Sequence, residues 1–147
     1  DAALQAQIEV AALAWETCIA ATAIHYINDV VADMGDMVPP AYGSLDNFTN
    51  LTKHWAELKG FALGLQFSPV SPFRTVDTIG GIDGTEALRR VLSLLGDAPV
   101  LADGSQGGVA PSGTATEALA AYEAQLLEAR DLMQEAYGLN PDAVSIW

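Results

Sequence analysis

The sequence predicts an all-α protein, an antiparallel four-helix bundle with long loops. Apolar residues recur at alternating spacings of three and four in several long segments, which is the period of an amphipathic helix. No segment shows sustained alternation of period two, so strands beyond a short loop hairpin are not expected. The chain has 147 residues, enough to bury a core of its own. We therefore expect a single helical-bundle domain over residues 1–147.

The first predicted helix runs from Ala2 to about Met34, and it carries two apolar stripes. The first has heptad-like spacing and turns polar toward its end: Leu4, Ile8, Ala11, Trp15, Cys18, Thr22, His25 and Asp29. The second lies beside it: Ala12, Ile19, Ala23, Tyr26 and Val30. An apolar face this broad is expected of a helix that packs against two neighbours.

The second predicted helix, Leu51–Phe67, follows a loop that contains Pro39 and Pro40, which cannot continue a helix. Asn50 or Thr52 is expected to cap its N-terminus. One face carries residues at helical spacing: Leu51, Trp55, Leu58, Ala62 and Leu65. This helix is the most regular apolar segment of the chain, so we expect it in the core.

Two further helices complete the predicted bundle. After a glycine-rich loop, Asp83 or Thr85 is expected to cap a short helix over Glu86–Leu95, which buries Leu88, Val91, Leu92 and Leu95. A long polar loop then spans Asp97–Gly113. The last helix covers about Thr114–Tyr137, and its inward residues are Leu119, Tyr122, Leu126, Ala129 and Met133. We expect the apolar C-terminal tail to dock on another surface.

Composition and charge exclude some classes of protein. The 19 acidic and 6 basic residues give a formal net charge of −13, which repels phosphate backbones and anionic lipids. We therefore expect no binding to nucleic acid, and no uninterrupted apolar run predicts a membrane span. Cys18 is the only cysteine, so an internal disulfide and a cysteine-based zinc site are excluded.

The strongest candidate for chemistry is His54 with Glu57, three residues apart on the second predicted helix. This spacing places an imidazole and a carboxylate on neighbouring surface, where they can bind one metal ion, share a proton or stabilise the helix as a pair. The order differs from the Glu-x-x-His of di-iron bundles, and no second histidine completes a thermolysin-type motif.

His25 and Asp29 form a second pair at a spacing of four on the first predicted helix. If this helix faces Leu51–Phe67, the two pairs converge and offer two imidazoles and two carboxylates, a donor set that suits zinc or iron. The alternative interpretation is a core histidine satisfied by its carboxylate partner. The predicted metal ligands are His54, Glu57, His25 and Asp29.

Three segments resemble one family of proteins: AWETCIAATAIHYINDV, KHWAELKGFALGLQFSP and LLGDAPVL. They are similar to bacterial secreted lipoproteins known as domain of unknown function 4856, which are related to the imelysin-like proteins. The resemblance covers about Ala11–Leu101. It implies an all-helical fold of paired four-helix bundles at the cell envelope, secreted to the periplasm or the outer-membrane surface, with this chain as the C-terminal part of a longer precursor.

Imelysin-like proteins carry a Gly-x-His-x-x-Glu motif that is associated with metal binding and with a peptidase classification. His54 and Glu57 match its last four positions, whereas Thr52 stands where the motif has glycine. For the relatives, the resemblance points to the acquisition of iron or other metals. The partner it implies is the N-terminal part of the same precursor or another protein subunit.

Three hypotheses follow. The first is a non-enzymatic envelope protein that binds a divalent metal or a metal-bearing ligand through His54 and Glu57, with His25 and Asp29 as second contributors. The second is an imelysin-type metallopeptidase in which the metal activates water. The third is a structural or assembly domain whose His-x-x-Glu pair only fastens the helices.

Overall fold

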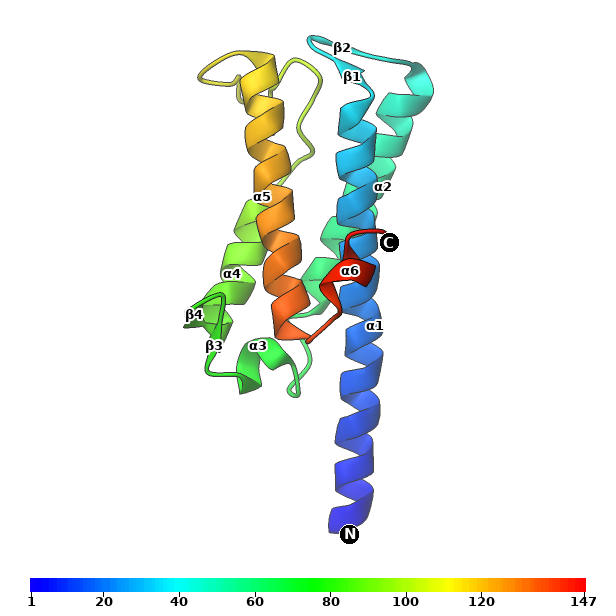
Figure 1. Ribbon diagram of the computed structural model, residues 1–147, viewed down its shortest axis with the longest axis vertical. Coiled ribbons are helices and arrows are strands. Elements are labelled where there is room, and N and C mark those ends of the chain that lie inside the picture. Colours follow the sequence, from blue (N-terminus) through cyan, green and yellow to red (C-terminus); the bar gives the residue numbers. More distant parts are fainter.

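The computed structural model describes residues 1–147 and confirms that the protein is predominantly helical (Figure 1). Four helices of eight residues or more make up the body: α1 (Ala2–Gly35), α2 (Leu45–Gly64), α4 (Gly84–Leu95) and α5 (Ala115–Ala136). Two single-turn helices, α3 (Pro72–Thr75) and α6 (Pro141–Val144), occupy connections. The helix α2 packs along α1, α4 packs along α5, and α5 also contacts α1.

Strands are confined to two short hairpins in the loops, as the sequence predicts. The first joins α1 to α2 and pairs β1 (Met37–Val38) with β2 (Ala41–Tyr42). The second precedes α4 and pairs β3 (Thr78–Ile79) with β4 (Ile82–Asp83). Gly80 and Gly81 form the turn of the second hairpin at positive φ values of 59° and 76°. A tight turn between two-residue strands uses glycine because a side chain is strained in this conformation.

The start of α2 differs from the prediction. The helix begins at Leu45 and ends at Gly64, and its N-cap is Ser44, whose side chain accepts from the backbone N–H of Asn47 at 3.0 Å. The prediction of Asn50 or Thr52 as the cap was therefore wrong. The residues between Leu45 and the predicted start at Leu51 are mostly polar, so they show no apolar periodicity from which a helix could be predicted. Asn47 holds this segment in place by donating to the carbonyl oxygen of Asp33 at 2.8 Å.

The predicted inward stripes of α2 and α5 are largely confirmed. Leu51, Leu58, Ala62 and Leu65 are fully buried, and Trp55 packs against the core. All five inward residues predicted for α5 are buried. Asp83 caps α4 as expected. The buried residues of α4 include Leu94, which was not predicted, whereas Leu92, which was predicted to be buried, is only half-buried. Thr114 and Glu117 form a reciprocal capping box at the start of α5.

The N-terminal part of α1 projects past every other element (Figure 1). The first buried residue of the helix is Glu16, whose carboxylate accepts from the Tyr137 hydroxyl. The heptad-like stripe is therefore uncovered at its N-terminal end, where Leu4, Ile8 and Trp15 are 62%, 53% and 76% exposed. The reason is length: α1 has 34 residues, whereas α2 has 20 and α5 has 22.

By length and composition alone, α1 is a candidate membrane-spanning helix. Core helices of soluble proteins and signal sequences meet the same requirements. The C-terminal tail docks on the C-terminal half of α1, where the side-chain amide of Asn28 donates to the carbonyl oxygens of Val144 at 2.9 Å and Trp147 at 3.0 Å. Docking of the tail, predicted on another surface, therefore takes place within this chain.

Candidate functional site

The predicted site lies where the C-terminal half of α1 faces α2. We call it the α1–α2 seam and define it by His25, Tyr26, Asp29 and Asp33 from α1 with His54, Glu57 and Phe61 from α2. The β1–β2 hairpin turns the chain so that the two helices run antiparallel. This places the end of α1 beside the middle of α2, so residues 21 positions apart meet.

His54 binds Asp33, and this contact was not predicted. The Nδ1 atom of His54 lies 2.8 Å from the Oδ2 atom of Asp33, and the two side chains are 20% and 14% exposed. An ionised carboxylate can only accept, so Nδ1 carries the proton and donates to Asp33. The bond fixes the tautomer and the orientation of the ring, and it leaves Nε2 free to accept a proton or to bind a metal.

Glu57 lies one turn after His54, as predicted, but no hydrogen bond joins the two. Its Oε2 atom is buried and has no hydrogen-bond partner. The only cation near this oxygen is the Lys53 ammonium, at 4.0 Å. A buried carboxylate oxygen without a partner is costly, so this atom is the natural acceptor for a proton, a water molecule or a cation.

Tyr26 contributes an aromatic ring to the seam. Its ring stacks on Phe61 at 5.9 Å, and the rings of His25 and His54 lie 5.3 Å and 6.0 Å from it. Burial raises the pKa of the Tyr26 hydroxyl, and the nearby charges of Glu57 and Asp29 raise it further. The phenol therefore stays protonated beside the Glu57 carboxylate.

The second predicted pair forms within α1. The Nε2 atom of His25 lies 3.2 Å from the Oδ2 atom of Asp29, in agreement with their spacing of four. The His25 side chain is 50% exposed, so this pair faces solvent more than His54 and Asp33 do. Nowhere in the chain do three His, Cys, Asp or Glu side chains gather closely enough to hold one metal ion. Joint metal binding by both pairs stays a prediction.

Sequence reasoning missed Asp33 as a partner of His54. A signal was present, because Asp33 follows Asp29 by four residues and so continues the polar end of the α1 stripe. The contact could not be predicted without the geometry of the β1–β2 hairpin, because this hairpin determines which residues of α1 lie opposite each residue of α2.

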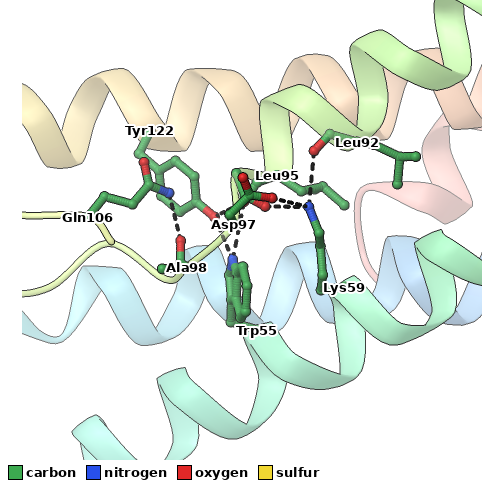
Figure 2. A network of polar contacts seen from close by, with 9 residues as sticks. Trp55, Lys59, Leu92, Leu95, Asp97, Ala98, Gln106 and Tyr122 are labelled. Carbon is green, nitrogen blue, oxygen red and sulfur yellow. Dashed lines mark hydrogen bonds and ion pairs between the residues drawn. The ribbon is translucent and has the colours of Figure 1, made fainter. Parts of the chain in front are cut away.

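The opposite flank of α2 carries a second polar network, which closes the end of α4 (Figure 2). The indole N–H of Trp55 lies 2.8 Å from the Tyr122 hydroxyl and 3.2 Å from the carbonyl oxygen of Leu95, and the Tyr122 hydroxyl donates to the same carbonyl at 2.8 Å. Burial raises the pKa of Tyr122 well above its usual range. Every donor in this cluster is used, which is typical of a structural network.

Lys59 completes this network one turn after Trp55. Its ammonium donates to the carbonyl oxygen of Leu92 at 3.2 Å and to that of Gly96, and it lies 3.5 Å from the Asp97 carboxylate. The last carbonyls of a helix have no partner within the helix, so a cation here satisfies them and offsets the negative end of the helix dipole. Lys59 therefore caps α4 from a neighbouring helix.

A cavity of about 530 Å³ lies between the Asp97–Gly113 loop and α5. The only charged residue in its lining is Glu117, whose carboxylate accepts from the backbone and side chain of Thr114 at 2.8 Å each. These hydrogen bonds lower the pKa of Glu117. The cavity thus offers neutral amide and hydroxyl groups and no free charged side chain for catalysis or metal binding.

Comparison of the chain with protein-family models, with curated proteins and with solved structures gives no match. The fold and the seam define a helical protein with one polar, partly buried histidine and carboxylate cluster between its first two long helices. This cluster is the candidate functional site.

Proposed function

We propose that this chain is a non-enzymatic, imelysin-like helical protein of the cell envelope that binds a divalent cation, zinc or iron, or a metal-bearing ligand at the α1–α2 seam. One observation carries the proposal. The ring of His54 is oriented by Asp33 through Nδ1, and one turn further on the Oε2 atom of Glu57 is buried without a hydrogen-bond partner.

This arrangement has the chemistry of a metal ligand with its supporting residue. A histidine that binds a metal through one ring nitrogen usually donates from the other to a carboxylate, as His54 does to Asp33. Imidazole nitrogen and carboxylate oxygen together suit zinc and iron. The net charge of −13 also raises the local concentration of cations.

Two protein ligands leave the other coordination positions to water or to donor atoms of the ligand itself. This favours a metal that arrives in a complex, or one that is held weakly, over a tightly bound structural ion. His25 and Asp29 are the proposed second contributors. Because they already bind each other at 3.2 Å, their recruitment has to break that contact.

The resemblance to imelysin-like proteins supports this proposal in two ways. Its most specific segment, HWAELKGFALGLQ, contains both His54 and Glu57. Helix contacts from α1 to α2, α2 to α4, α4 to α5 and α5 to α1 support the finer fold we propose, an antiparallel four-helix bundle.

The metallopeptidase alternative requires more of the site. A catalytic zinc takes three protein ligands and keeps one position open, and the seam supplies two. Cleavage of a protein substrate that is sensitive to chelators and disappears in Glu57→Gln would establish this alternative. We rank it below simple binding for this reason.

The structural alternative is favoured by the position of Asp33. Its side chain binds His54 and its backbone carbonyl accepts from Asn47, so one residue of α1 fastens α2 at two points. In this case His54→Ala lowers the melting temperature by the same amount with and without metal.

Metal analysis of the chain, purified without chelator and then dialysed against a limiting amount of Zn²⁺ or Fe²⁺, tests the proposal. The wild type retains metal, whereas His54→Ala and Glu57→Gln lose it. His25→Ala shows whether the second pair contributes. Glu123→Gln, which removes an exposed carboxylate of α5, is the matched control and keeps wild-type metal. Equal, substoichiometric metal in all of these proteins contradicts the proposal.

A further inference from the structure

A second buried polar cluster lies outside the α1–α2 seam, at the end of the body where α3 and the C-terminus of α5 meet α1 (Figure 1). We call it the Glu16 cluster. It consists of Glu16 of α1, Ser71 directly before α3 and Tyr137 at the end of α5. Glu16 is 3% exposed and Ser71 is fully buried. Neither the proposed metal site nor the network around Trp55 uses these side chains.

The Tyr137 hydroxyl brings the cluster together. It donates to the Oε1 atom of Glu16. Burial raises the pKa of this phenol well above its usual range, and the hydrogen bond to Glu16 and the charge of Glu16 raise it further, whereas the neighbouring Ser71 side chain lowers it. The phenol therefore keeps its proton and donates it to Glu16. Glu16 and Ser71 thus both lie beside the Tyr137 hydroxyl, although they come from segments far apart in the sequence.

Two oxygen atoms of the cluster have no partner. The Oε2 atom of Glu16 and the Oγ atom of Ser71 are buried and form no hydrogen bond. Both side chains are more than nine-tenths buried, so bulk water does not solvate them. A buried polar atom without a partner is costly, and in native proteins it is usually satisfied by an ordered water molecule or an ion. Because both atoms belong to neighbours of the Tyr137 hydroxyl, one bound species can contact both.

The surroundings of Glu16 carry no compensating positive charge. Glu16 takes part in none of the ion pairs of the chain. Arg74, three residues after Ser71, is exposed and donates to the carbonyl oxygen of Gln66 instead. Through Tyr137 the carboxylate also lies at the C-terminus of α5, the negative end of the helix dipole, and the last turn of α5 contains no basic residue. The cluster therefore lacks a positive charge as well as hydrogen-bond partners.

We propose that the Glu16 cluster binds a monovalent cation, Na⁺ or K⁺, through Glu16 Oε2 and Ser71 Oγ, with the phenolic oxygen of Tyr137 as a third contributor. Hard cations take oxygen ligands, and the C-terminal ends of helices contribute to the Na⁺ sites of transporters. One carboxylate neutralises one positive charge, whereas a divalent ion would leave a net charge buried. Zinc and iron are disfavoured, because the cluster offers no imidazole and no second carboxylate.

Two other occupants fit the cluster less well. A bridging water molecule satisfies the hydrogen bonds of Glu16 and Ser71, but it leaves the negative charge of Glu16 uncompensated beside the end of α5. A proton on Glu16 removes the charge, but the hydrogen bond from Tyr137 favours the ionised carboxylate. The net charge of −13 also concentrates cations around the protein. A cation bound here joins α1, α3 and α5, so it stabilises the fold independently of the proposed metal site.

Thermal unfolding of the full chain in NaCl, KCl and tetramethylammonium chloride at equal ionic strength tests the proposal. Tetramethylammonium screens surface charge equally well but is too large for a buried site. Na⁺ or K⁺ well above its dissociation constant raises the melting temperature by about 5 °C relative to tetramethylammonium. Glu16→Gln, which preserves the size of the side chain and an acceptor for Tyr137, removes this difference, and Ser71→Ala reduces it. Glu9→Gln, an exposed carboxylate of the same helix, is the matched control and keeps the wild-type difference.

The ²³Na NMR signal gives a second measurement that does not depend on unfolding. The folded wild type and Glu9→Gln broaden the sodium signal, K⁺ reverses the broadening, and Ser71→Ala and Glu16→Gln weaken or abolish it. Equal melting temperatures of the wild type in all three salts overturn the proposal and assign the cluster to a buried water molecule or a proton. An effect of Na⁺ or K⁺ that persists unchanged in Glu16→Gln and Ser71→Ala places the cation elsewhere and also overturns it.

Discussion

The Nδ1 atom of His54 donates to the Asp33 carboxylate across the α1–α2 seam, over a distance of 2.8 Å. This bond joins the end of the first helix to the middle of the second, and it decides which ring nitrogen of His54 is available. Asp33 thus orients the His54 ring, a role that its position near the end of the α1 pattern does not reveal. The first prediction concerns this residue.

Asp33→Asn weakens both the fold and the proposed site. The charge-assisted bond to His54 is replaced by a weaker neutral one, so we expect a loss of about 1–2 kcal/mol in the free energy of unfolding. Metal affinity falls by about 10–100-fold, as is typical when the residue supporting a histidine ligand is changed. Urea titration and metal competition measure the two effects. Asp97→Asn is the control, and a wild-type affinity in Asp33→Asn contradicts the role of the bond.

We expect Trp55 and Tyr122 to be energetically coupled, because both donate to the carbonyl oxygen of Leu95 and the indole N–H of Trp55 also donates to the Tyr122 hydroxyl (Figure 2). Trp55→Phe and Tyr122→Phe each cost about 1 kcal/mol or more in the free energy of unfolding. A double-mutant cycle gives a coupling energy of about 0.5–3 kcal/mol. Additive losses would show that the two side chains act independently.

Lys59→Met removes the cation that caps α4 and retains most of the apolar stem. Because hydrogen bonds from a charged group contribute about 1.5–3 kcal/mol, we expect a clear fall in the denaturation midpoint. Amide hydrogen exchange quickens first in the last turn of α4, around Leu95. Lys53→Met is the matched control, since its ammonium lies 4.0 Å from Glu57 and makes no helix cap. Similar effects from both variants would contradict the capping role.

The buried tyrosines predict a loss of stability in alkaline solution. Burial raises the pKa of both Tyr122 and Tyr137 in the folded protein. An unfolded tyrosine ionises near pH 10, so the unfolded state releases protons that the folded state retains. The stabilisation is complete below about pH 10 and declines as the pH rises further. Tyr122→Phe flattens this decline in denaturation curves measured at several pH values, and an unchanged slope speaks against its burial as the cause.

The sequence predicts the helices well where one face meets the core. All five residues predicted to face inward from α5 are buried, and only Leu132 was missed, because α4 and α1 pack on this helix and periodicity shows which side faces inward. The start of α2 was missed because a turn capped by Ser44 carries no apolar signal. Periodicity also shows which residues in the N-terminal part of α1 share a face, but it does not show whether another element covers them.

The same limits apply to the candidate site. The contact between His25 and Asp29 follows from their spacing on one helix. The contact between His54 and Asp33 depends on the turn between two helices, and a pattern within either helix does not contain that information. The unpartnered oxygen of Glu57 is likewise a property of packing, because it depends on the neighbours that exclude water from it.

The most direct test of the metal site is the ¹⁵N spectrum of the histidine rings during titration with Zn²⁺. The chain contains only two histidines, so the ring nitrogens of His54 can be assigned with one His25→Ala variant. The account predicts that Zn²⁺ shifts the signal of His54 Nε2, that Nδ1 remains protonated toward Asp33, and that Glu57→Gln weakens the response. Signals of His54 that do not move at stoichiometric Zn²⁺, or a response confined to His25, would contradict it.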